Sequence, residues 1–120
     1  MFDHLRTVTP LEVNEKIENK QSFVLNIVAT WCSDCMDQQE NIISFVNELK
    51  QQELDVVQLI AQHEKGVFVD LAYQQLVEHF GGHGYPRTVL IKNGEAVSTS
   101  NVEIISETEL LALATEFSKL

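Results

Sequence analysis

The sequence predicts an α/β fold, with a central mixed sheet of about four strands and helices on both of its faces. Short apolar runs of the buried-strand type alternate with helical periodicity in the earlier part of the chain, which is typical of parallel strands joined by helices. Near the C-terminus, Asn93-Gly94 separates two strand-like runs and indicates an antiparallel hairpin. Capping signals mark where the first and the last helix begin.

The earlier elements can be placed one by one. Thr9-Pro10-Leu11-Glu12 supplies an N-cap, a proline for the first helical position and a capping-box glutamate, so a helix is expected from there to about residue 20. The next predicted elements are a buried strand at residues 23–29, a helix from 32 to about 51, a strand at 55–61 and a helix at 67–80, which Gly81-Gly82 stops.

The later part of the chain is predicted to hold the hairpin and a closing helix. Strands at residues 88–91 and 96–99 flank the Asn-Gly turn, and Ser106-Glu107-Thr108-Glu109 repeats the capping pattern before an amphipathic helix that reaches Phe117. The order is therefore α-β-α-β-α-β-β-α, with an antiparallel edge added to a parallel core. Because no repeat or linker interrupts this pattern, residues 1–120 are expected to form a single domain.

Composition and charge argue against several classes of function. The chain has 120 residues and a net charge of −10, with the charged residues interspersed along it. Such a surface repels a phosphate backbone or an anionic membrane, so a nucleic-acid or lipid-surface role is disfavoured. No apolar run approaches the ~18 residues that span a bilayer, and the N-terminus lacks the basic start and apolar stretch of a signal peptide. These features predict a cytoplasmic protein, expected to be a monomer.

Both cysteines lie in the stretch NIVATWCSDCMDQQ, where Ser33 and Asp34 separate Cys32 from Cys35. The pair can be a redox centre, a metal clip or two neighbouring core residues. Cys32 falls where a buried strand gives way to a helix, and the free N–H groups and dipole of a helix N-terminus stabilise a thiolate. The thiolate is the nucleophile in disulfide exchange, and a second cysteine one turn further on can then attack the mixed disulfide. This chemistry favours the redox interpretation.

A zinc site is the main alternative for the cysteine pair. The histidines that could complete a Cys₂His₂ set are His63, His79 and His83. None is close to the cysteines in sequence, whereas zinc motifs usually space their ligands tightly. Only His83 is expected to approach the pair, so no metal site is predicted.

Two motifs together resemble the thioredoxin family. Trp31-Cys32-Ser33-Asp34-Cys35 is followed about fifty residues later by Gly84-Tyr85-Pro86, and then by a Val-Leu-Ile-Lys-Asn-Gly-Glu run at residues 89–95. The similarity extends over nearly the whole chain, in order and with matching spacing. It implies a thioredoxin-like fold and a thiol–disulfide oxidoreductase that reduces disulfides in cytosolic proteins.

The resemblance also implies the roles of individual residues. Cys32 would attack the substrate disulfide, Cys35 would resolve the mixed disulfide, and Trp31 would shield the pair. Gly84, Tyr85 and a cis Pro86 would shape the groove in which an extended substrate segment docks. The disulfide between the two cysteines would be the redox group, with no other cofactor. Since no nucleotide-binding glycine loop is present, electrons would come from a separate reductase.

The departures from the family pattern bear on rate and on partners. Asn26 stands where thioredoxins have a buried aspartate, and Gln58 stands where that aspartate's lysine partner lies. The two amides are expected to hydrogen-bond each other, which would preserve stability, but an amide cannot take a proton from Cys35. Asp34 and Ser33 replace the usual proline and glycine. Asp34 is interpreted either as an acidic residue that suits the helix N-terminus or as a substitute proton acceptor.

The segment 102–104 and Arg87 also differ from what the family usually has. The segment Val102-Glu103-Ile104 lacks the family's usual glycine, which would alter the rim of the groove. Arg87, directly after the proline, is expected to form a salt bridge with one of the many carboxylates. Because a fold alone does not define a function, a thioredoxin-fold binding or adaptor module with weak or no redox activity remains the alternative.

Overall fold

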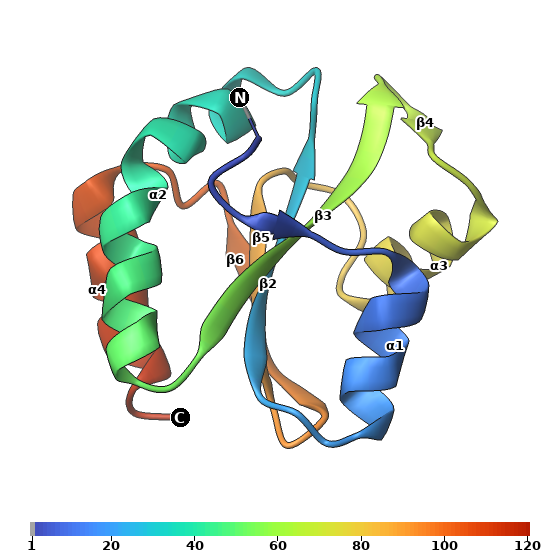
Figure 1. The fold of residues 1–120 in the computed structure, drawn as a ribbon. Helices are drawn as coiled ribbons and strands as arrows, with labels where there is room; N and C mark the ends of the chain where they lie inside the picture. Colours follow the sequence, from blue (N-terminus) through green and yellow to red (C-terminus); the bar gives the residue numbers. More distant parts are fainter. Residues whose placement is uncertain (1) are drawn as a thin grey trace.

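The computed structural model describes residues 2–120, and Figure 1 shows that its helices lie on both sides of one twisted sheet. The elements are β1 (Arg6–Thr7), α1 (Pro10–Glu18), β2 (Phe23–Ala29), α2 (Ser33–Gln51), β3 (Asp55–Glu64), β4 (Val67–Phe68), α3 (Leu71–His79), β5 (Arg87–Lys92), β6 (Glu95–Val102) and α4 (Glu107–Phe117). The sheet order is β1-β3-β2-β5-β6, and β4 pairs with β3. Since β2 is parallel to β3 and antiparallel to β5, the predicted mixed α/β sheet is confirmed. It has six strands rather than about four.

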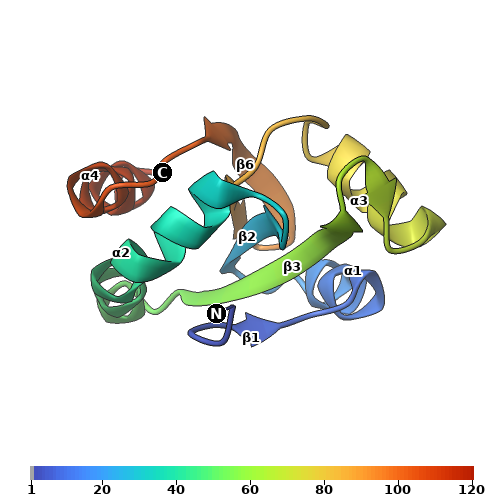
Figure 2. The same ribbon diagram turned by 90° about the horizontal axis from the view of Figure 1, so that it is seen from above.

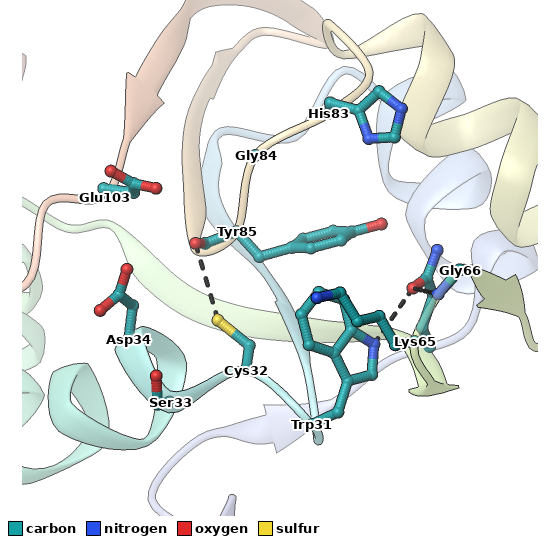
Figure 3. Close-up of a pocket in the computed structure, with 11 residues that line it drawn as sticks. Trp31, Cys32, Ser33, Asp34, Lys65, Gly66, His83, Gly84, Tyr85 and Glu103 are labelled. Atoms are coloured by element: carbon teal, nitrogen blue, oxygen red, sulfur yellow. Dashed lines mark hydrogen bonds between the residues drawn. The ribbon is translucent and has the colours of Figure 1, made fainter.

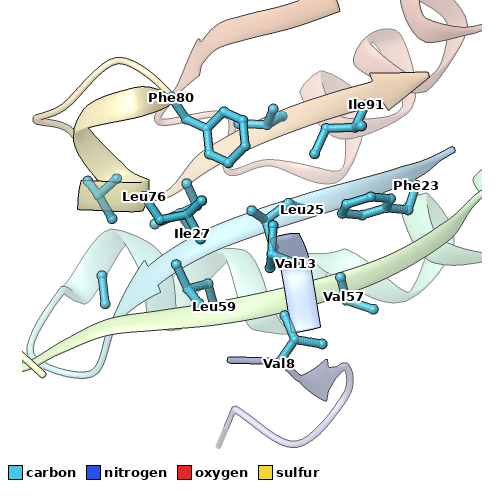
Figure 4. Close-up of a cluster of buried hydrophobic side chains, with 13 residues drawn as sticks. Val8, Val13, Phe23, Leu25, Ile27, Val57, Leu59, Leu76, Phe80 and Ile91 are labelled. Carbon is cyan, nitrogen blue, oxygen red and sulfur yellow. The ribbon is translucent and has the colours of Figure 1, made fainter. Parts of the chain in front are cut away.

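The two faces of the sheet carry separate apolar cores. Successive side chains of a strand point to opposite faces, so Leu25 and Ile27 of β2 pack toward α1 and α3, beside Leu59 of β3 (Figure 4). Val24 points the other way, toward α2 and α4. Figure 2 shows these two helix pairs on opposite sides of the sheet. Full burial of each such side chain contributes roughly 1.5–3 kcal/mol, and every residue of β2 is buried.

The helix starts follow the capping signals, with one correction. The capping boxes at Thr9 and Ser106 form as expected, each with its reciprocal glutamate contact. The helix predicted at residues 67–80 was wrong at its beginning, because Val67–Phe68 pairs with β3 as strand β4. The helix starts only at Leu71, where the carboxylate of Asp70 accepts the N–H groups of the first turn.

Other boundaries differ by a few residues, and a second strand besides β4 was not predicted. β1 has only two residues, too few to show any periodicity, and it is held by parallel pairing with β3. β3 continues past residue 61 to Glu64, and β6 covers Glu95–Val102 rather than 96–99. No helix within residues 2–120 combines the length and apolarity that crossing a membrane requires.

The connectivity brings four chain segments to one edge of the sheet. β2 and β3 are parallel, and β6 runs antiparallel to β5, which itself runs antiparallel to β2. The carboxyl ends of β2, β3 and β6 and the amino end of β5 therefore meet at the same edge. The cysteine motif follows β2 at this edge, and the Gly-Tyr-Pro segment precedes β5 there.

Candidate active site

The first cysteine caps the helix that follows β2. Cys32 is the N-cap of α2, with extended backbone angles of φ −87° and ψ 114°. Its sulfur accepts the backbone N–H of Cys35 at 3.2 Å, so a free amide of the helix N-terminus points at the sulfur. Cys32 is 7% exposed and Cys35 is fully buried, and the two thiols are not joined by a disulfide. Cys32 is therefore the sulfur that a substrate can reach.

The loop before β5 lies against Cys32. The Tyr85–Pro86 peptide bond is cis, as expected, and the Cys32 thiol donates to the Tyr85 carbonyl oxygen at 3.7 Å (Figure 3). Gly84 has φ +108°, and a Cβ built on it would lie 2.5 Å from Cγ1 of Val102. Only glycine fits this position, both for its backbone angle and for the available space. The loop is thus packed tightly between β6 and the cysteine motif.

Two aromatic rings form the wall beside Cys32. Trp31 is partly buried and meets Tyr85 edge-on, with ring centroids 6.0 Å apart. Its indole Nε1 donates to Oε1 of Gln62 at 3.1 Å, and the same oxygen accepts the N–H of Gly66 at 2.9 Å. Nζ of Lys65 lies 5.5 Å from the centre of the indole ring, within the range of a cation–π contact. The turn between β3 and β4 therefore holds the tryptophan in place.

A groove of about 490 Å³ connects these groups. It is lined by Trp31, Cys32, Ser33, Asp34, Gln62, Lys65, Gly66, His83, Gly84, Tyr85 and Glu103 (Figure 3). Cys35 and Pro86 are buried next to it, whereas Asn26 and Gln58 lie in the interior of the sheet. The sequence interpretation missed Gln62, Lys65 and Gly66, because it ended β3 at residue 61.

The histidines considered for zinc are distributed over separate parts of the surface. His83 lines the groove, Nδ1 of His63 lies 3.5 Å from the Thr30 hydroxyl, and the ring of His79 packs on Phe80. In the described chain, no three or more His, Cys, Asp or Glu side chains gather to hold a metal ion.

The environment of Cys35 favours its neutral form. Burial raises the pKa of the Cys35 thiol far above its usual range, and a hydrogen bond with Cys32 acts in the same direction. The carboxylate of Asp34 adds a smaller rise. Burial also raises the pKa of Tyr85, so the groove presents a neutral phenol. Cys35 must therefore lose a tightly held proton before it can act as a nucleophile.

The expected hydrogen bond between Asn26 and Gln58 is absent. The two residues are paired in register on β2 and β3, but each amide has other partners. Nε2 of Gln58 donates to the Phe2 carbonyl at 2.6 Å and to the Thr7 hydroxyl at 3.1 Å, which ties it to the segment around β1. Gln58 Oε1 has no hydrogen-bond partner among residues 2–120. The expectation failed because it rested on strand alignment alone, and β1 was not predicted.

Asn26 instead belongs to a chain of hydrogen bonds, called here the amide relay. The Thr88 hydroxyl donates to Asn26 Oδ1 at 3.0 Å, and Asn26 Nδ2 donates to Oε1 of Gln38 at 2.7 Å. Nε2 of Gln38 then donates to the carbonyl of Ile104 at 2.9 Å. The relay links β5, β2 and α2 to the chain just after Glu103. Gln38, which nothing in the sequence singles out, is one of its two inner members.

Contrary to expectation, Arg87 forms no salt bridge with any residue in the described part of the chain. Arg87 is 7% exposed, and its two terminal nitrogens donate to the carbonyls of His83 and Thr99, each at 2.6 Å. A Cβ on Gly81 would lie 2.6 Å from Nη1, so the glycine leaves room for the guanidinium. Carbonyls rather than carboxylates bind this arginine because the loop curls back over the start of β5. Arg87 thereby fastens the Gly-Tyr-Pro loop to β6.

The fold and the cysteine pair together define a class of protein. An α/β sheet with Cys-x-x-Cys at a helix N-terminus, beside a loop with a cis-proline, indicates a thiol–disulfide oxidoreductase of thioredoxin-like fold. The family model described as Thioredoxin matches residues 4–116. The chain therefore belongs to the thioredoxin family.

Solved structures support the fold. The chain is similar to thioredoxin f2 of Chlamydomonas reinhardtii, at 14% identity and a TM-score of 0.70 over 94% of this chain and 95% of that one. It is also similar to oxidized mitochondrial thioredoxin 3 of Saccharomyces cerevisiae, at 16% identity and a TM-score of 0.70, over 97% and 95% of the two chains. Thioredoxin of Fasciola hepatica gives 17% identity and a TM-score of 0.68, over 93% and 98%. None of the curated proteins compared with this sequence matches it.

Proposed function

We propose that the chain reduces disulfide bonds in other proteins, with Cys32 as the nucleophile and Cys35 as the resolving thiol. The observation that carries the proposal is the contrast between the two sulfurs. Cys32 opens onto the groove at the N-terminus of α2 and beside the Tyr85 carbonyl, and Cys35 is enclosed one turn further along. Membership of the thioredoxin family supports the same activity.

The reaction proceeds in two exchanges. The Cys32 thiolate attacks one sulfur of the substrate disulfide, so the substrate S–S bond breaks, a mixed disulfide forms and the released sulfur takes up a proton. Cys35 then loses its proton and attacks Cys32, which forms the Cys32–Cys35 disulfide and releases the second substrate thiol. The substrate gains two electrons and two protons, and the protein dithiol is oxidised. A separate reductase returns the electrons, and the proposal requires no cofactor beyond this disulfide.

The second exchange is the slower one in this proposal. The buried polar side chains of residues 2–120 are Asn26, Gln38, Gln39, Gln58, Gln62, Arg87 and Thr88, and none of them is a carboxylate. Neither an amide nor a hydroxyl group takes up a proton near neutral pH, and the guanidinium of Arg87 is already protonated, so none of these groups can take the proton of Cys35. Asn26 in place of a carboxylate therefore slows the resolving step.

An insulin-reduction assay with dithiothreitol as the electron source tests the proposal. Wild-type protein is expected to accelerate precipitation of the reduced chains, and Cys32→Ser is expected to abolish the acceleration. Cys35→Ser is expected to accumulate a mixed disulfide with the substrate, visible by mass spectrometry, because the attack still occurs and the resolution does not. Wild-type protein that neither accelerates reduction nor forms a mixed disulfide would refute a reductase.

That negative result would support the second candidate, a binding module that holds a partner segment without turning it over. Two observations together favour this candidate. The pKa of Cys35 is raised, and the buried polar residues of the described chain include no carboxylate that could accept its proton. The proposed setting is a reducing compartment such as the cytoplasm. Both cysteines of the sequence lie in the redox pair, and a lone close pair in that compartment is typically catalytic rather than structural.

A further inference from the structure

We infer that the groove is electrically polarised across Cys32, and that it selects substrate segments with a basic residue on one side of the attacked cysteine and an acidic residue on the other. This inference rests on the proposed function and names the class of substrate. It concerns Asp34 and Glu103 on one side and Lys65 on the other, and all three line the groove that contains Cys32.

The sheet topology places the opposite charges on opposite sides. In the order β1-β3-β2-β5-β6, Cys32 follows β2 in the middle, Lys65 follows β3 on one side, and Glu103 follows β6 on the other. Figure 3 agrees, because Asp34 and Glu103 lie on one side of Cys32 and Lys65 lies with Trp31 on the other. An extended segment that crosses the groove over Cys32 would have one end beside the carboxylates and the other end beside the ammonium group.

The two carboxylates are free to meet a ligand. Asp34 is half-buried in the first turn of α2, and Glu103 is exposed directly after β6. No ion pair between described residues involves either of them, or Lys65. Uncompensated charges at the rim of a groove attract groups of opposite sign and repel groups of like sign, which gives selectivity more than affinity.

The backbone ties Glu103 to the loop that faces Cys32. Glu103 has φ +60°, a conformation that glycine adopts freely and that costs a glutamate free energy. Its N–H donates to the Pro86 carbonyl at 2.8 Å, so the strained residue is tied directly to the loop that faces Cys32. A glycine here would relieve the backbone and would remove one of the two charges.

Lys65 is positioned by an element that shapes the same groove. It lies in the turn between β3 and β4, and its ammonium group is held over the Trp31 ring at 5.5 Å. The neighbouring Gly66 shares Gln62 with the indole. The positive end of the groove is therefore fixed to the aromatic wall beside Cys32.

The test separates local polarity from the overall charge of −10. Two peptides of identical composition carry a single cysteine in disulfide linkage to a small neutral thiol, one with Lys before and Glu after the cysteine, the other with the two exchanged. A third peptide has alanine at both positions. Because the charged peptides have equal net charge, the overall field of the protein cannot distinguish them, whereas a polarised groove can.

The expected result is a ratio of kcat/KM between the two charged peptides of about threefold to tenfold, falling toward one as salt is raised. Asp34→Asn and Glu103→Gln are each expected to lower the ratio, and the double variant to bring it close to one. Lys65→Gln is expected to lower it as well. Glu116→Gln, an exposed carboxylate on α4, is the control and is expected to keep the wild-type ratio.

The melting temperature of a glycine variant and the kcat/KM ratio of the control variant test the inference further. Glu103→Gly is expected to lower the ratio as Glu103→Gln does and also to raise the melting temperature. A purely structural role for Glu103 would not produce this combination. Equal kcat/KM for the two charged peptides in the wild type, or a ratio that Glu116→Gln lowers as much as Glu103→Gln, overturns the polarised groove. Failure to reduce any of the three peptides overturns the proposed reductase instead.

Discussion

Replacing Asn26 by aspartate should make both stability and turnover depend on pH. A protonated aspartic acid can reproduce the pattern of the asparagine, since its O–H can donate to Gln38 Oε1 and its C=O can accept from Thr88. An ionised carboxylate cannot, because it would place a charge 2.7 Å from the Gln38 oxygen. If Gln38 turned its amide to donate, it would lose its bond to the Ile104 carbonyl. The site therefore favours the protonated acid.

The magnitude follows from linkage between protonation and folding. Position 26 is fully buried, and a buried carboxyl that must stay protonated to keep its hydrogen bonds has a raised pKa. A rise of about two pKa units above the unfolded value of about 3.9 corresponds to about 2.7 kcal/mol of lost stability. Since the folded pKa is the higher one, the loss is small below pH ~4, grows through pH 4–6 and is complete above pH ~6.

Urea unfolding of wild type and Asn26→Asp at pH 4.5 and pH 7.5 measures this difference. Thr88→Val is the matched control, because it removes a hydrogen bond of the same relay without adding a titratable group, and its cost should be the same at both pH values. Loss of stability by Asn26→Asp that is equal at both pH values would show that the carboxyl does not titrate as argued.

The same variant should change the resolving step. In the wild type the raised pKa of Cys35 means that the thiolate fraction, and with it the rate of resolution, grows about tenfold per pH unit through the neutral range. An aspartate that is ionised near neutral pH can accept the Cys35 proton, so the variant should resolve mixed disulfide faster at pH 7 and depend less steeply on pH. Rapid-quench measurement of mixed-disulfide decay gives the rate. An unchanged rate and an unchanged pH profile would refute the role assigned to Asn26.

Three further substitutions, the first paired with a control substitution at Gly66, test the supports of the groove by urea unfolding. Gly84→Ala should lower the free energy of unfolding by about 2–3 kcal/mol, because the added methyl group meets Val102 of β6. Gly66 also has positive φ but faces open space, so Gly66→Ala should lower it by only about 1 kcal/mol. Equal losses for the two variants would contradict the packing argument. Arg87→Lys should cost about 2–3 kcal/mol, since one ammonium group cannot satisfy both carbonyls that the guanidinium binds; a loss within ~0.5 kcal/mol would contradict it. Gln62→Leu should cost about 1–2 kcal/mol and shift the fluorescence of Trp31, the only tryptophan of the chain, and an unchanged spectrum would show that this amide does not hold the indole.

The sequence was informative wherever local chemistry decides the structure. The capping residues Thr9 and Ser106 begin helices because their hydroxyls accept amides three residues along, a contact that needs no tertiary partner. The buried run of β2 and the Asn-Gly turn likewise carry their own signals. The cysteine motif and the cis Tyr85–Pro86 bond could be placed because the family resemblance supplied the geometry between them.

The features that were missed depend on contacts between distant residues. β1 and β4 have two residues each and exist only because β3 pairs with them, so no local pattern marks them. Gln62 and Lys65 joined the groove because β3 continues beyond the apolar run. The partner of Asn26 could not be read from strand alignment, because it lies on α2 and its choice depends on how far each side chain reaches.

Because Cys32 and Cys35 differ in burial, the number of thiols that react with a reagent reports local unfolding of the chain. A thiol-alkylating reagent that reaches only open sulfurs should add one label to the folded chain, at Cys32, and a second only when the first turn of α2 opens to free Cys35. The ratio of doubly to singly labelled protein, read from intact mass, then counts opening events at the redox helix without any introduced probe. Because label number is independent of catalysis, the same reading can be taken for variants that no longer turn over a substrate.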